Sequence, residues 1–219
     1  MSYDVSRVPG ARPVEGAEAH ALFGRVMGLV AITCGFAALG AWAGRDLTGL
    51  WWVVPWVGAL VCVVGLNVTA QRAPALATVL LFGLGFLLGL ATGVTVLYYA
   101  ENEPGVVWQA AGATGLTVAA MGAWGYATRR DLSYLYRTLF WCLLALLAFG
   151  FVIVLFGIEG ATTIYALGGI AVFAGYTLVD FNRLRRAGQS EAVPLAASIF
   201  LDVFNLFLFF LQLFGAGRN

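Results

Sequence analysis

The chain has 219 residues, of which 61% are hydrophobic and only 11% are charged, with a net charge of +1. A soluble domain carries about 25% charged residues, so this composition excludes a domain that folds in water and predicts an integral membrane protein without a nucleic-acid partner. All 12 basic residues are arginine. Because no lysine is present, retinal proteins and other proteins that form a Schiff base on lysine are excluded as well.

Residues 1–20 carry Glu15 and Glu18 and no apolar core, so we expect a disordered cytoplasmic tail rather than a secretion signal. Residues 21–219 are predicted to form one all-α membrane domain. It contains seven runs long enough to cross a hydrocarbon core, which takes about 20 helical residues. The predicted spans are 22–43, 50–70, 75–99, 106–127, 138–157, 162–182 and 195–214. In the third of these, Gly85, Gly89 and Gly93 recur at four-residue spacing, which is typical of close helix packing.

The arginines alternate between the two sides of the predicted spans. If the N-terminus lies in the cytoplasm, only Arg45 and Arg218 fall outside, and the other ten arginines fall inside or at inner span ends. Cytoplasmic loops carry an excess of arginine and lysine. The expected topology is therefore N-in and C-out with seven transmembrane helices.

Two acids lie inside predicted spans, Asp180 in the sixth and Asp202 in the seventh. An ionisable group in a span is costly, about 2.5–3.5 kcal/mol on insertion scales, and marks a candidate functional site. In the last span, Ser198, Asp202, Asn205 and Gln212 have helical spacing and form one polar stripe, which must face protein or water. Tyr176 shares a helix face with Asp180 in the same way.

Two interpretations of the acids stay open. Each aspartate either only ties helices together, or the two act as a pair. Two carboxylates that meet in a low dielectric cannot both ionise at little cost, so such a pair would share one proton and respond to pH. When ionised, Asp180 and Asp202 would offer oxygen ligands to a transient Ca²⁺ ion. The three cysteines and one histidine have no spacing typical of a zinc site or a catalytic triad, and we expect no enzyme activity and no resident cofactor.

The segment from Pro194 to Gly215, with Asp202 and Asn205 at its centre, resembles the closing signature of the Bax inhibitor-1 family. Residues 179–183 resemble the sixth-helix segment of that family, and residues 130–133 resemble its loop between the fourth and fifth helices. The resemblance covers the chain from about residue 20 onward and is most specific in the last helix.

The resemblance implies a seven-helix fold with the last helix central, and a pH-sensitive Ca²⁺ leak gated by a hydrogen-bonded aspartate pair. The pair carries over to Asp180 and Asp202. An arginine at the inner end of the second helix in bacterial members carries over to Arg72. One departure is residues 58–62, which are wholly apolar where some members have an acid in the second helix.

The leading hypothesis is thus a multi-pass leak channel of the bacterial inner membrane, with the lipid bilayer, protons and permeant Ca²⁺ as its partners. Arg72 would pair with Asp180 in the closed state. The alternative is a non-transporting protein that binds another membrane complex, such as a quality-control protease, through its N-terminal tail. Deleting residues 1–20 would separate the two. An intramembrane hydrolase has less support, because the motifs of aspartyl intramembrane proteases are absent around Asp180 and Asp202.

Overall fold

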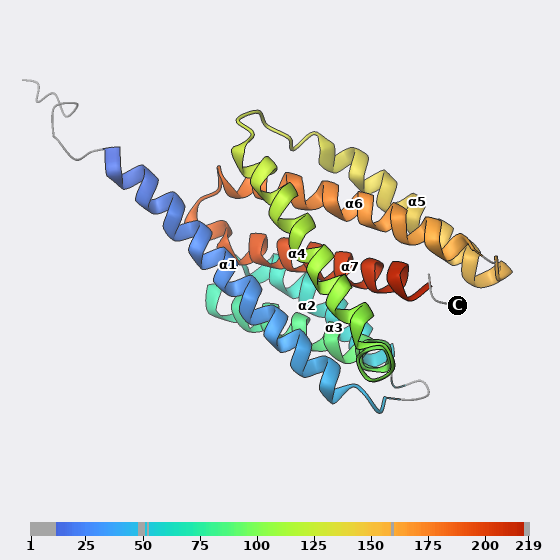
Figure 1. The fold of residues 1–219 in the computed structure, drawn as a ribbon. Helices are drawn as coiled ribbons and strands as arrows, with labels where there is room; N and C mark the ends of the chain where they lie inside the picture. The colour runs from blue at the N-terminus through green and yellow to red at the C-terminus, as the bar shows by residue number, and fades with distance from the viewer. Residues whose placement is uncertain (1–11, 48–50, 52, 159, 217–219) are drawn as a thin grey trace, which may run out of the picture.

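The computed structural model describes residues 12–47, 51, 53–158 and 160–216, and it is all-helical over that part of the chain. Its helices pack as an elongated bundle (Figure 1). They are α1 (Arg12–Ala43), α2 (Val53–Thr69), α3 (Pro74–Asn102), α4 (Pro104–Ala127), α5 (Leu135–Phe156), α6 (Ala161–Leu184), the short 3₁₀ turn η3 (Gln189–Glu191) and α7 (Ala192–Ala216).

The helix ends follow the turn residues of the sequence. Pro74 and Pro104 occupy the first turns of α3 and α4, where a missing backbone N–H costs least. The helix α5 ends at Gly157, whose φ of 59° lies in the left-handed region that favours glycine. The predicted spans therefore agree with the observed helices to within a few residues, except at the N-terminus.

The predicted tail boundary at residue 20 does not match the structure, because α1 already begins at Arg12. The added turns contain Ala17, Glu18 and Ala19, residue types that favour helix even where no membrane surrounds them. Residues 1–11 of the expected tail lie outside the described residues, as does Arg218.

Six of the described helices are long and apolar enough to cross a membrane, and α2 is a shorter apolar helix of 17 residues. At 1.5 Å per residue α2 is about 26 Å long, slightly less than the hydrocarbon core of about 30 Å. Large apolar side chains are exposed on the outside of the bundle, for example Leu116 at 75% and Val154 at 82%. A surface of this kind is stable only against lipid, so the structure supports a helical membrane protein.

The last helix lies inside the bundle, packed against α1, α3, α4 and α6 (Figure 1). Half of the residues in its most apolar stretch are buried, compared with 6% in α5, which borders the bundle. On the other side, α1 and α3 approach so closely that a Cβ at Gly89 would lie 2.0 Å from the carbonyl oxygen of Ala37. The glycine spacing in α3 is thus explained by helix packing.

The connections α2–α3, α4–α5 and α6–α7 meet at one end of the bundle, which we call the basic end. Arg25 of α1 borders the same hollow as Gln71 and Gln189, which places the start of α1 there too. An ion pair of 2.8 Å between Asp131 and Arg186 joins the α4–α5 connection to the α6–α7 connection. The basic end contains most of the arginines in the described residues, as the charge pattern predicted: Arg25, Arg72, Arg129, Arg130, Arg137, Arg183, Arg185 and Arg186.

Candidate functional site

The two intramembrane aspartates lie at the interface of α6 and α7, near the basic end. The helical spacing of Ser198 and Asp202 turns both side chains toward α6. The α6 side of the interface contains Thr177 and Asp180, which are fully buried. The site is therefore formed by two helices that follow each other in the chain and pack along their lengths.

Asp180 is fully buried, and both of its carboxyl oxygens accept hydrogen bonds from hydroxyl groups. The hydroxyl of Tyr136, at the start of α5, donates to Oδ1. The hydroxyl of Ser198 on α7 donates to Oδ2. Asp180 thus joins three helices, and its carboxyl is held in one orientation.

Asp202 is 4% exposed. Its carboxyl lies close to the side chains of Asp180 and Thr177. The Thr177 hydroxyl already donates to the carbonyl oxygen of Phe173, at 2.8 Å. Within the described part of the chain, Asp202 Oδ2 is buried and has no hydrogen-bond partner. A buried carboxyl oxygen without a donor is costly, so this atom is the least satisfied polar group of the site.

The other predicted polar residues, Tyr176, Asn205 and Gln212, make no hydrogen bond to either aspartate among the described residues. The half-buried ring of Tyr176 lies 6.3 Å from the ring of Tyr136, centroid to centroid, and close enough to both aspartates for electrostatic contact. Asn205 turns back to its own helix and donates to the carbonyl oxygen of Leu201 at 2.7 Å. Gln212 is half-buried two turns further along α7. Of the predicted stripe, only Ser198 bonds directly to Asp180.

Arg72 is not brought to the aspartate pair. It is exposed in the α2–α3 turn, whereas the cation that faces Asp180 is Arg183, one turn further along α6. Arg183 Nη2 also lies 2.7 Å from Glu191 Oε2 in the α6–α7 connection. In this conformation the predicted Arg72–Asp180 pair is absent from the described residues, because the α2–α3 turn lies apart from the α5–α6–α7 contact.

A family model described as inhibitor of apoptosis-promoting Bax1 matches residues 19–219. The chain belongs to the Bax inhibitor-1 family. Among its relatives, the protein YrjE of Lactococcus lactis is 30% identical over 181 residues, which cover 78% of this chain and 75% of YrjE. The inner membrane protein YbhL of Escherichia coli K12 is 29% identical over 177 residues, 74% of this chain and 73% of YbhL. A Vibrio cholerae relative, named only as a membrane protein, is 27% identical over 135 residues, 61% of this chain and 60% of the relative.

Membership of the Bax inhibitor-1 family confirms the resemblance read from the last helix, and the named relatives agree with a membrane location. The structure also brings to the site residues that the sequence did not single out. Tyr136 is one of them, since a tyrosine at a span end is typical of an interfacial aromatic belt. Its contact with Asp180 joins residues 44 positions apart in the chain.

Asn182, two residues after Asp180, anchors the α4–α5 connection to α6. Its amide nitrogen lies within hydrogen-bonding distance of three carbonyl oxygens, those of Gly125 (3.0 Å), Thr128 (2.8 Å) and Arg130 (3.1 Å). Its Oδ1 accepts from the backbone N–H of Leu132, at 3.0 Å, and from Arg186. One buried amide therefore fixes the loop that precedes Tyr136 and so positions the donor to Asp180.

We expect Asn182→Leu to destabilise the protein by at least about 2 kcal/mol, because it leaves several loop N–H and C=O groups unpaired. The measurement is thermal unfolding in detergent together with the rate of proteolysis in residues 128–134. Asn67→Leu is the matched control, since the Asn67 amide bonds only to Val63 of its own helix among the described residues. Equal stability of the two variants would contradict the anchoring role.

Asp131 lies in the same connection, outside the membrane-spanning helices. Hydrogen bonds from Ser133, followed by the contact with Arg186, lower the pKa of the Asp131 carboxyl to about 2. Because the folded-state pKa lies below the unfolded value, the stabilising contribution of these contacts is complete above the unfolded pKa and is lost only as the pH falls toward 2. Asp131 therefore stays ionised throughout pH 5 to 8 and cannot act as the pH sensor.

No group of three or more histidine, cysteine, aspartate or glutamate side chains gathers into a metal site within the described ranges. Ca²⁺ takes six to eight oxygen ligands as a rule. Asp180 and Asp202 supply carboxylate oxygens from two residues only, so water would have to complete the shell.

Proposed function

We propose that this protein is a pH-sensitive Ca²⁺ leak channel of the bacterial inner membrane, with seven membrane-spanning helices, N-in and C-out. The observation that carries the proposal is the unpartnered Oδ2 of Asp202 beside a fully bonded Asp180. Asp180 already accepts hydrogen bonds from two hydroxyl groups, and no arginine pairs with Asp202 among the described residues. A shared proton between the carboxyls satisfies this arrangement at low pH.

Loss of that proton would change the forces between α6 and α7. Two carboxylates in a low-dielectric interface repel each other, and the repulsion acts on a helix that contacts four others. Movement of α7 is therefore the proposed opening step. Ca²⁺ then neutralises the exposed carboxylates as it passes, which requires no resident cofactor and no catalytic residue.

The test of the proposal is Ca²⁺ entry into liposomes that contain the purified protein, measured with an internal dye between pH 5 and pH 8. Protein-free liposomes are the control for passive permeability. We expect flux to rise as the pH rises, because the proposed open state is the deprotonated one. Flux equal to that of empty liposomes at every pH would exclude a leak.

A second candidate is a protein that binds another membrane complex through its N-terminus. It is favoured by the first turns of α1, which extend beyond the rest of the bundle and are exposed at Ala17 and Glu18 (Figure 1). Deleting residues 1–20 removes these exposed turns and the segment before them, and it separates the two functions. A leak survives the deletion, whereas binding through this segment is lost.

A further inference from the structure

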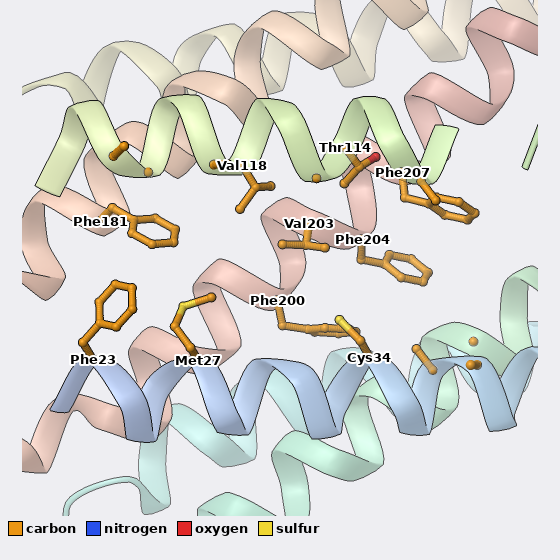
Figure 2. Close-up of a pocket in the computed structure, with 18 of the residues that line it drawn as sticks. Phe23, Met27, Cys34, Thr114, Val118, Phe181, Phe200, Val203, Phe204 and Phe207 are labelled. Carbon is orange, nitrogen blue, oxygen red and sulfur yellow. The ribbon is translucent and has the colours of Figure 1, made fainter. Parts of the chain in front are cut away.

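A large apolar groove lies on the side of α7 opposite to the aspartates. Its volume is about 1040 Å³, and it is bounded by α1 and α4, with α7 between them as its floor. Figure 2 shows Phe200, Val203 and Phe204 of α7 in the space that separates the two outer helices. Asp180 and Asp202 do not line this groove, because Asp180 bonds to Tyr136 of α5 and Ser198 of α7, and Asp202 faces α6.

The groove is open along part of its α4 wall, where the lining residues are small. Gly115, Ala119 and Ala123 line it and are exposed, and a Cβ at Gly115 would have no atom within 4 Å. Leu116 and Trp124 of the same helix are exposed apolar residues on the outside of the bundle. The opening therefore faces the hydrocarbon of the bilayer, and an apolar chain is the occupant that fits it.

The length of the groove matches a lipid chain. Its α4 wall runs from Ala111 to Ala127, and these two ends are about 24 Å apart at a rise of 1.5 Å per residue. This covers most of the hydrocarbon core, which is about 30 Å thick. One lipid tail can thus lie along α7 without leaving the membrane.

The groove ends at the basic end of the bundle. Ala127 is its last α4 residue, and the guanidinium of Arg185 donates to the Ala127 carbonyl oxygen at 3.5 Å. Arg129 and Arg130 follow Ala127 and are exposed. The ion pairs seen between described residues involve Arg45, Arg183 and Arg186 and leave these three arginines without an acidic partner.

An apolar channel that ends beside unpaired guanidinium groups is complementary to one class of molecule. Basic pockets between membrane helices bind anionic lipid headgroups, and arginine forms two parallel hydrogen bonds to a phosphate. We propose that the groove holds one anionic phospholipid, with a tail between α1 and α4 against the phenylalanines of α7 and its phosphate at Arg129, Arg130 and Arg185. The proposal rests on the membrane location and not on ion conduction.

The test is native mass spectrometry of the full-length protein taken from vesicles of phosphatidylethanolamine and phosphatidylglycerol. We expect wild type to retain one phosphatidylglycerol molecule in preference to phosphatidylethanolamine. Gly115→Leu with Ala119→Leu fills the groove and should reduce retention of both lipids at least fivefold. Gly112→Leu is the matched control, since Gly112 lies on the same helix, has equally open surroundings and does not line the groove.

A second pair of variants tests the headgroup contact without changing the groove. Arg130→Gln with Arg185→Gln should reduce the preference for phosphatidylglycerol by roughly fivefold for each arginine, whereas Arg137→Gln on the α5 surface should keep it. Three results with the wild-type protein would each overturn the proposal: lipid retention without a preference for phosphatidylglycerol, no lipid retention, or a protein dimer in place of the lipid adduct. Ca²⁺ flux is measured separately, so a wild-type protein that conducts Ca²⁺ but retains no lipid refutes only the lipid site.

Discussion

Asp202→Asn should abolish the rise in Ca²⁺ flux between pH 5 and pH 8. Asparagine has nearly the shape of a protonated aspartate but has no proton to release, so the carboxylate repulsion at the α6–α7 interface cannot develop. We expect the ratio of flux at pH 8 to flux at pH 5 to fall to about 1, with flux held at its low-pH level. Asp180→Asn should act in the same direction. The measurement is the liposome assay over the full pH range.

Asp131→Asn provides the matched control for this prediction. It makes the same chemical change at the same end of the protein, but the Asp131 carboxyl has a pKa of about 2 and stays ionised over the whole assay range. Its variant should keep the wild-type pH response. Unchanged responses in both Asp180→Asn and Asp202→Asn would refute the aspartate mechanism.

Two arginine variants in the same assay test which arginine acts on Asp180, Arg72 as the family resemblance implies or Arg183 as in the structure. Arg183 faces Asp180 in the structure, so Arg183→Gln removes a positive charge that favours the carboxylate. The midpoint of the flux response should then move upward by up to about one pH unit. Arg72→Gln should leave the midpoint unchanged if the observed contacts hold. If Arg72 instead pairs with Asp180 when the channel is closed, its variant should leak more at low pH.

A loss of stability is also expected from Gly89→Ala at the contact of α1 and α3. The new Cβ would lie 2.0 Å from the carbonyl oxygen of Ala37, and backbone cannot move aside as a flexible side chain can. The two helices must separate, which we expect to cost about 1–3 kcal/mol. Unfolding in detergent, followed by circular dichroism, measures the change.

Gly83→Ala is the control for this prediction. Gly83 lies on the same helix, but its added Cβ would meet only the sulfur of Cys62 at 3.7 Å, an ordinary contact. Alanine also favours the helix over glycine by about 0.5–1 kcal/mol, so this variant should be neutral or more stable. A loss of stability as large as that of Gly89→Ala would show that the close approach of the backbones is not the cause.

The spans and the polar stripe of α7 could be predicted because both depend on local sequence. A run of apolar residues long enough to cross a bilayer needs no knowledge of its neighbours, and helical spacing alone places Ser198 and Asp202 on one face. The start of α1 was the exception. The turns from Arg12 onward have no hydropathy signal, although Ala17, Glu18 and Ala19 favour helix.

The partners across the bundle could not be predicted, because they depend on which helix faces meet. Tyr136 reaches Asp180, and the Asn182 amide oxygen accepts from the N–H of Leu132 over a separation of 50 residues. Neither contact has a spacing rule in the chain. The family resemblance pairs Arg72 with Asp180, whereas the α6 neighbour Arg183 faces Asp180 in the structure.

By itself the sequence determined that this is a membrane protein, where its apolar spans lie, and that two of its acids lie within spans. The two acids stood out because the chain has few charges and most of the others lie in loops or at span ends. A charge inside a span is costly, so its presence there indicates a function. Only the tertiary structure decided what surrounds those acids. It placed Asp180 among hydroxyl donors, left Asp202 Oδ2 without one, and opened an apolar groove on the opposite side of α7, because packing angles between helices, not local sequence, set the space between them.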